Sequence, residues 1–213
     1  MIDAIAVLKQ GGQAMWLIVA ISVAAGIIFL QRAFHIHRAQ IKTTDFIRGI
    51  FTIVGKGNLV EAVSQCEETP GPVAQMVRVA ILERERGPER VRQAMLEVGL
   101  AEIPRLERNL PLLLTLAQLA PLAGLLGTVL GMLDSLGIMM NQAPQVYANE
   151  LAGGLWTALL TTAAGIAVAI PTYAGYNFLV HRVESIVLDM ERVFDEILLV
   201  IPVAKNGTDG GAG

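Results

Sequence analysis

The hydroxyl groups of four threonines stand inside otherwise apolar stretches, and they are the side chains there that could do chemistry. Thr128 lies in "PLAGLLGTVLGMLDS", and Thr157, Thr161 and Thr162 lie in "GLWTALLTTAAGIAVAIP". A hydroxyl in such surroundings can line a wetted path, hydrogen-bond a charged group that another helix presents, or bond its own helix while two helices pack. These interpretations stay open for Thr128 and Thr162. For Thr157 and Thr161 the spacing favours packing.

Small residues recur at helical spacing around these threonines. Residues three and four apart share one face of a helix, so a narrow face in each stretch carries little side-chain bulk. The two sets are Gly124, Thr128, Gly131 and Ser135 in the first stretch, and Thr157, Thr161, Gly165 and Ala169 in the second. Such faces let helix backbones approach closely in lipid. Gly131 and Gly165 are therefore predicted to be helix-packing or pore positions.

Ionisable groups are absent from the middle of both stretches. Asp134 stands six residues after Thr128, toward the outer end of its stretch, where it is interpreted as a hydrated carboxylate near the interface. A proton path through lipid needs an exchangeable group within the low-dielectric region. If this chain moves protons, a partner must supply the central carboxyl.

Three windows of the sequence contain no Asp, Glu, Lys or Arg: Gln10–Gln31, Asn109–Leu133 and Leu151–Val180. Each exceeds the ~20 apolar residues with which a helix crosses the ~30 Å hydrocarbon core. The chain is 54% hydrophobic and 16% charged, against about 25% charged residues in ordinary soluble domains. No stretch alternates as a strand would. The sequence predicts an all-α polytopic membrane protein with three transmembrane helices.

Basic side chains are concentrated between the first two windows, whereas the link "NQAPQVYANE" between the last two has no Lys or Arg. Short loops rich in Lys and Arg stay in the cytoplasm, so the N-terminus is predicted outside and the C-terminus inside. Among these basic residues, Arg32, Arg38, Lys42, Arg48 and Lys56 follow the first window, and Arg105 and Arg108 precede the second.

The chain is expected to divide into seven segments. Glycine and proline punctuation separates short helices before the second window, and an apolar stripe of helical period continues after the third. The segments are a periplasmic N-terminus with transmembrane helix 1 (1–34), a cytoplasmic helical region (35–108), transmembrane helix 2 (109–140), a periplasmic link (141–150), transmembrane helix 3 (151–180), a cytoplasmic helix (181–201) and a disordered tail (202–213).

Several kinds of site find no support in the sequence, which has no nucleotide-binding loop and no nucleophile beside a base. His35 and His37 in "FHIHR" fall on opposite sides of a helix, which disfavours a metal site. Cys66 is the only cysteine and is expected to be a free buried thiol. The net charge of −3 argues nothing about nucleic acid, and no basic aromatic patch suggests it as a partner. We expect no cofactor, no metal and no enzymatic activity.

Two motifs carry a resemblance to a known family. "APLAGLLGTVLGM" and "ALLTTAAGIAVAIPTYAGYN" resemble the ExbB/TolQ/MotA family of ion-channel proteins, and the match is closer to ExbB and TolQ than to MotA, which has four spans. The resemblance implies a homopentamer in the bacterial inner membrane, around a central pore that holds the helices of a dimeric ExbD-like or TolR-like partner. It also implies that the partner carries the aspartate that takes and releases protons.

The resemblance places the family's pore threonines at Thr128 and Thr162. It implies that the complex uses proton motive force to move a TonB-like or TolA-like protein that reaches the outer membrane, for example in biopolymer or nutrient transport. One residue departs from the pattern: ExbB and TolQ commonly have a glutamate where Thr157 stands. We hypothesise that Asp134 partly replaces that acid near the outer mouth.

Two alternatives to this interpretation stay open. The chain could be a sodium- or proton-driven motor stator of the MotA type, or a purely structural membrane scaffold whose small faces only pack helices. The absence of a central acid suits a scaffold equally well.

Overall fold

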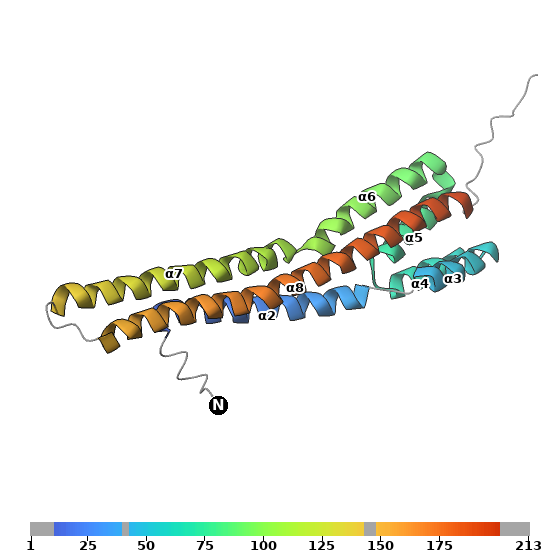
Figure 1. The fold of residues 1–213 in the computed structure, drawn as a ribbon. Helices are drawn as coiled ribbons and strands as arrows, with labels where there is room; N and C mark the ends of the chain where they lie inside the picture. The colour runs from blue at the N-terminus through green and yellow to red at the C-terminus, as the bar shows by residue number, and fades with distance from the viewer. Residues whose placement is uncertain (1–10, 40–42, 143–147, 201–213) are drawn as a thin grey trace, which may run out of the picture. The chain divides into compact units, whose positions relative to one another are not determined.

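The computed structural model of the protein describes residues 11–39, 43–142 and 148–200 (Figure 1). Within these ranges the regular structure is entirely helical and contains no strand, so the predicted all-α fold class is confirmed. The chain forms two units with separate packing. The first contains the chain up to Arg32 together with Asn109–Leu179, and the second contains Ala33–Arg108 together with the chain from Val180 onward.

Three helices are long and apolar enough to cross a membrane, in agreement with the three predicted spans. The spans belong to α2 (Gly12–Ala39), α7 (Leu110–Gln142) and α8 (Ala148–Val200). α8 runs without a break for 53 residues. This continuity agrees with the apolar stripe that was expected to prolong the third span beyond residue 180.

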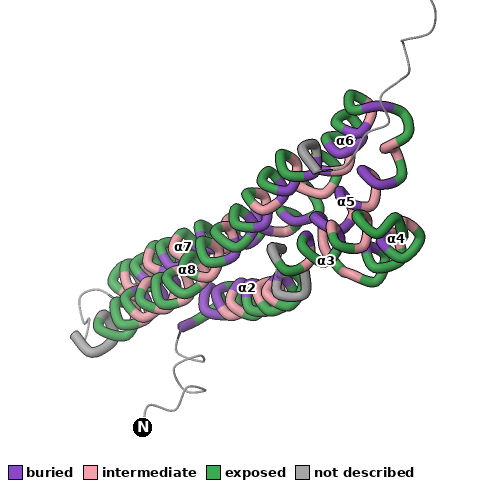
Figure 2. The backbone as a smooth tube through the Cα atoms, turned by 90° about the vertical axis from the view of Figure 1, so that its right-hand side faces the viewer, coloured by how far each residue is buried: buried purple, intermediate pink, exposed green. Residues whose placement is uncertain are grey.

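In the first unit, α2 packs against α7 and α8 through small and branched apolar side chains. Ile18 and Ile21 of α2 meet Ala120 and Ala123 of α7, and partly buried Ala164 of α8 joins them. The outward faces of the same helices carry large exposed apolar side chains, and Figure 2 shows exposed backbone along α7 and α8. Large apolar side chains on an outer face are typical of helices that contact lipid or other membrane helices.

The prolines of α7 and α8 occupy two kinds of position. Pro111 is the second residue of α7, where the missing backbone N–H has no helical acceptor to lose. Pro121 and Pro171 lie inside α7 and α8, and both helices continue through them. The chain enters α7 at Asn109, whose φ of 66° is a left-handed conformation that asparagine tolerates.

The second unit consists of short helices and the C-terminal part of α8. They are α3 (Thr43–Gly55), α4 (Leu59–Glu68), α5 (Pro72–Glu83), the 3-10 turn η1 (Arg84–Arg86) and α6 (Pro88–Glu107). Gly57, Gly71 and Gly87 have φ values of 78°, 124° and 101° at the breaks, as the glycine and proline punctuation predicted. Only glycine adopts such values without strain.

Asn58 precedes α4 at a position where asparagine is a common helix cap, but its side chain does not cap the backbone of the helix. Its amide Nδ2 donates to Glu61 Oε2 at 2.5 Å.

The core of the second unit is formed by apolar helix faces. Each residue of one face of α5 is at most 3% exposed, namely Val73, Met76, Val77, Ala80 and Ile81. The stripe on α8 is also buried, at Val183, Ile186, Met190, Val193 and Ile197. Burial of a large apolar side chain contributes roughly 1.5–3 kcal/mol, so these faces hold the unit together.

Some sequence-based predictions fall partly or wholly outside the described residues. The predicted link 141–150 is helical at both ends, since α7 reaches Gln142 and α8 begins at Ala148, and 143–147 lie outside the described ranges. The predicted disordered tail, 202–213, lies outside them as well.

Candidate functional site

The small faces of α7 and α8 bring the two helix backbones into contact. A methyl group on Gly131 would lie 2.7 Å from the carbonyl oxygen of Gly154. A methyl group on Gly165 would lie 2.6 Å from the carbonyl oxygen of Ala120 and 3.0 Å from Gly124 Cα. No side chain fits between backbones this close. The structure therefore places Gly131 and Gly165 in the packing between the two helices.

Thr161 belongs to the same packed surface. Its side chain is fully buried, and its hydroxyl donates within its own helix to the carbonyl oxygens of Ala158 at 2.9 Å and Thr157 at 3.1 Å. A methyl group on Gly127 would lie 2.6 Å from Thr161 Cβ, so Thr161 fills the space that this glycine leaves. The expected packing role of Thr161 agrees with these contacts.

Thr128 and Thr162 meet across the interface, although 34 residues separate them in the chain. Their hydroxyl oxygens are hydrogen-bonded to each other. Thr128 Oγ1 also lies 3.2 Å from the carbonyl oxygen of Gly124 and 3.3 Å from that of Ala158. Thr162 Oγ1 lies 3.3 Å from the same Gly124 oxygen. Both side chains are half-buried, unlike fully buried Thr161.

The hydrogen-bonding capacity of this hydroxyl pair exceeds what the two helices use. A hydroxyl carries one hydrogen and two lone pairs. When one hydroxyl donates to the other, the second has a backbone carbonyl as its own acceptor. Lone pairs then remain on both oxygens, and rotation about the C–O bonds can redirect the hydrogens. The pair can therefore accept a hydrogen bond from an incoming acid or donate one to an incoming anion.

Thr157 and Asp134 lie apart from the hydroxyl pair along their helices. Thr157 is half-buried, and its hydroxyl donates to the carbonyl oxygen of Gly153 at 3.1 Å, one turn back on α8. Asp134 is exposed on α7, and six residues separate it from Thr128, a rise of about 9 Å along a helix. The structure brings neither of them into the Thr128–Thr162 contact.

Outside the membrane spans, the thiol of Cys66 is buried in the second unit and forms no disulfide. Burial raises its pKa from 9.0 to about 11, against a smaller opposing effect of Arg78. The thiol is thus uncharged at neutral pH and poorly nucleophilic. Among the described residues no group of three His, Cys, Asp or Glu side chains could hold a metal ion.

Two features of the site were not predicted from the sequence. The mutual contact of Thr128 and Thr162 depends on the register between α7 and α8, which one-helix spacing does not contain. The second feature is the hydrogen bond from Thr128 to the Gly124 carbonyl; the i−4 spacing that permits this bond was visible in the sequence. Outside the site, Arg32, one of the basic residues on which the predicted orientation rests, is only 5% exposed.

Residues 68–192, more than half of the chain, match the MotA/TolQ/ExbB proton channel family. The chain belongs to this family. The matched region contains α7, most of α8 and the whole Thr128–Thr162 site.

Relatives in the MotA/TolQ/ExbB family carry ExbB and TolQ names. A biopolymer transport protein named as an ExbB homologue, from Methanothermobacter thermautotrophicus, is 28% identical over 181 residues, which cover 83% of this chain and 63% of that protein. Biopolymer transport protein ExbB of Aquifex aeolicus is 43% identical over 43% of this chain and 61% of that protein. Tol-Pal system protein TolQ of Haemophilus influenzae is 36% identical over 47% of this chain and 43% of that protein.

The expected place of the chain within the family, closest to ExbB and TolQ, is confirmed by these relatives. The chain spans less than two thirds of the length of each of the three. The chain is thus a member of a proton-channel family, and the ExbB and TolQ members of that family are inner-membrane proteins.

Proposed function

We propose that this chain is the pore-forming, stator-like subunit of an inner-membrane complex that uses proton flow to energise a TonB-like or TolA-like protein acting at the outer membrane. Three observations support the proposal: membership of a proton-channel family, relatives named for biopolymer transport and the Tol-Pal system, and the hydroxyl pair between α7 and α8. The hydroxyl pair carries the argument, because packing alone does not require it.

The proton carrier in this proposal belongs to another chain. Neither Asn109–Leu133 nor Leu151–Val180 contains an acidic or basic side chain, so α7 and α8 offer hydroxyls at this depth and no group that titrates near neutral pH. An ExbD-like or TolR-like partner with a single span would supply the aspartate. Thr128 and Thr162 would line the path that this aspartate faces.

The hydroxyl pair suits both protonation states of such an aspartate. Its lone pairs accept the O–H of a neutral carboxylic acid, and its hydrogens, once rotated, donate to the ionised carboxylate. Hydrogen bonds to a charged group are worth about 1.5–3 kcal/mol, which lowers the cost of exposing the carboxylate within the membrane. Each proton that crosses 100 mV releases ~2.3 kcal/mol to drive motion.

The assembly in this proposal is a homopentamer with the N-terminus outside and the C-terminus inside. Its interior would hold the partner helices. The exposed apolar side chains along the membrane helices support contacts with further helices or lipid, among them Leu122 at 59%, Leu125 at 56% and Leu159 at 60% exposure. A structural scaffold would need only the packing formed by Gly131, Thr161 and Gly165.

Replacing Thr162 with valine tests the proposal, because valine keeps the shape of threonine and removes the hydroxyl. We expect Thr162→Val to lower proton-driven activity by at least about tenfold, the loss of one hydrogen bond to a charged group. The variant should still assemble with the partner, and co-purification of the two chains measures this. The measurement is proton uptake into vesicles that contain the chain and its co-expressed partner.

Thr161→Val is the matched control, since that hydroxyl bonds only carbonyls of its own helix in the described contacts. It should retain proton uptake. Normal uptake by Thr162→Val would refute the assignment and favour the scaffold. Uptake that needs sodium and resists a protonophore would favour a sodium-driven stator.

A further inference from the structure

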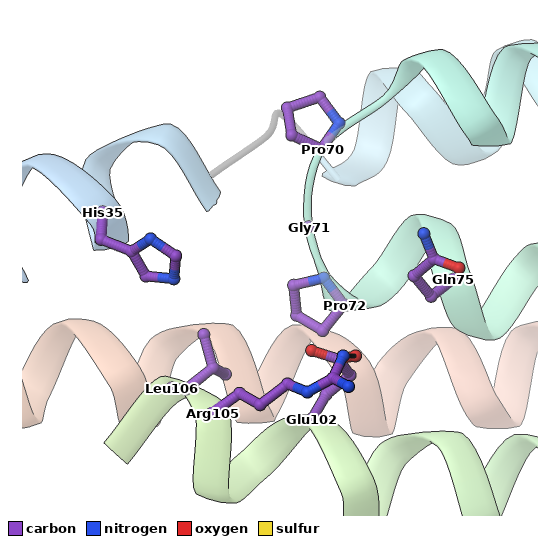
Figure 3. A pocket seen from close by; sticks show the side chains of 8 residues that line it. All are labelled: His35, Pro70, Gly71, Pro72, Gln75, Glu102, Arg105 and Leu106. Carbon is purple, nitrogen blue, oxygen red and sulfur yellow. Dashed lines mark hydrogen bonds and ion pairs between the residues drawn. The ribbon is translucent and has the colours of Figure 1, made fainter. Parts of the chain in front are cut away.

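A second polar site lies in the other unit, away in sequence from the threonines. A pocket of about 660 Å³ is lined by His35 of α2, the turn Pro70–Pro72, Gln75 of α5, and Glu102 and Arg105 of α6 (Figure 3). Ligand sites typically enclose ~300–1,000 Å³. The pocket is thus large enough for a small polar group, and the proton pathway does not use it.

The charged groups of the pocket come from α6 and form an ion pair that is open to solvent on the arginine side. Arg105 Nη1 lies 2.7 Å from Glu102 Oε1, and the Arg105 side chain is 73% exposed whereas that of Glu102 is 20% exposed. A partly exposed ion pair of this kind contributes little to folding, typically ~0–1 kcal/mol. Figure 3 shows the His35 ring directed from α2 toward the pocket, on the side opposite Arg105. Two basic side chains therefore face one space from two helices.

The polar groups of this pocket match the parts of a phosphodiester headgroup. A guanidinium and an imidazole donate hydrogen bonds to phosphate oxygens, and the guanidinium fork can do so at two atoms. The Gln75 amide can donate to the same group. α5 begins beside them at Pro72 with no side-chain cap, and the start of a helix favours negative charge. Glu102, beside Arg105, offers an acceptor for an amine or hydroxyl that is attached to the phosphate.

The position of these residues in the chain indicates where such a phosphate would come from. His35 stands four residues after the uncharged window ends at Gln31, and Arg105 stands four residues before the next window begins at Asn109. Four helical residues rise about 6 Å. Both basic groups are therefore attached close to the ends of membrane spans, where lipid phosphates are concentrated and basic pockets bind headgroups.

We propose that this pocket binds the phosphodiester headgroup of a membrane phospholipid. Arg105 and His35 contact the phosphate, and Glu102 contacts the amine or hydroxyl beyond it. The site is independent of the proposed proton pathway, so either proposal can fail without the other.

The test uses the full chain, purified in detergent and titrated with phosphatidylglycerol or with phosphatidylethanolamine, while native mass spectrometry counts the bound lipids. We expect a bound phospholipid whose affinity falls about tenfold in Arg105→Gln, the loss of one charge-assisted hydrogen bond. Arg108→Gln is the matched control, because Arg108 is three residues away and does not line the pocket. It should bind as the unchanged protein does.

Two further arms make the result decisive. His35→Gln should weaken lipid binding without touching the Glu102–Arg105 pair, and Thr162→Val should leave binding unchanged. Equal losses in Arg105→Gln and Arg108→Gln would overturn the proposal, because they would indicate general attraction to charge. Unchanged affinity in both Arg105→Gln and His35→Gln would also overturn it. Displacement of the lipid by an equal concentration of sodium phosphate would show that the pocket takes free phosphate.

Discussion

The interface between α7 and α8 and the interface between α5 and α6 are built from opposite kinds of residue. α7 and α8 meet through glycine, alanine and threonine, with backbones close enough that a methyl group on Gly131 would reach the carbonyl of Gly154. α5 and α6 meet through large buried side chains such as Val77, Val91 and Met95, each at most 1% exposed. The same chain thus uses two different ways of holding helices together.

The difference follows from the surroundings of each interface. Water drives large apolar side chains together, and each one buried contributes roughly 1.5–3 kcal/mol. Between helices in lipid that driving force is absent, so close backbone packing and hydrogen bonds replace it. The consequence for function is that the membrane interface can carry hydroxyls at its edge, whereas the other interface is filled by apolar atoms.

The largest expected difference between the two interfaces is the change in stability when one methyl group is added to each of them. Gly131→Ala places its Cβ 2.7 Å from a backbone oxygen and 3.0 Å from Ala158 Cβ, so we expect a loss of about 1–3 kcal/mol in stability. Gly99→Ala on α6 places its Cβ 3.8 Å from Met76 Sδ of α5 and 3.6 Å from Met190 Cε of α8, both ordinary contacts. Because alanine favours a helix over glycine by roughly 0.5–1 kcal/mol, Gly99→Ala should be neutral or stabilising.

Thermal unfolding of the two alanine variants in the same detergent measures this difference. The control is the unchanged protein with and without its partner. Equal destabilisation by Gly131→Ala and Gly99→Ala would show that the two interfaces tolerate bulk alike and would remove the contrast.

A second expected effect is the pH dependence of stability that arises from the buried thiol of Cys66 in the second unit. Its pKa in the folded protein, about 11, exceeds the ordinary value of 9.0 because of burial. The unfolded chain therefore loses its thiol proton first, and stability should fall as the pH rises from about 9 to about 11. The limiting slope is ~1.4 kcal/mol per pH unit. Cys66→Ala should lack this component, and chemical denaturation at pH 8, 9.5 and 11 measures it; parallel curves would contradict the burial effect.

The smallest expected effect concerns the membrane helices again, at exposed Asp134 in the last part of α7. Under the hypothesis that Asp134 partly replaces the acid missing at Thr157, Asp134→Asn should reduce proton-driven activity severalfold and change its pH profile. Stability should stay within about 0.5 kcal/mol, since the side chain is exposed. Vesicle uptake between pH 5 and 8 gives the profile. An unchanged rate and profile would eliminate the hypothesis.

Elements whose signals are local were predictable from the sequence. Charge-free windows, the buried face from Val73 to Ile81, and the breaks at Gly71 and Gly87 depend on composition and spacing within one segment, and the structure contains all of them. The packing of Gly131 and Gly165 was also visible as small residues at helical intervals. These features need no knowledge of a neighbouring helix.

The remaining features depend on register between segments. The contact of Thr128 with Thr162 fixes how α7 and α8 slide past each other, and two separate helical patterns do not determine that offset. The burial of Arg32 and the missing side-chain cap at Asn58 also depend on packing and side-chain conformation, which spacing along the chain does not contain. Asp134 and Thr157 were joined in one hypothesis, which awaits its functional test.

The uninterrupted course of α8 means that a single helix supplies side chains to both units. Thr162 belongs to the part of α8 in the first unit, and the buried stripe Val183–Ile197 belongs to the part in the second unit. A proline near the boundary at residue 180 would interrupt the backbone hydrogen bonds of α8, so it would disturb a packing element of each unit at once.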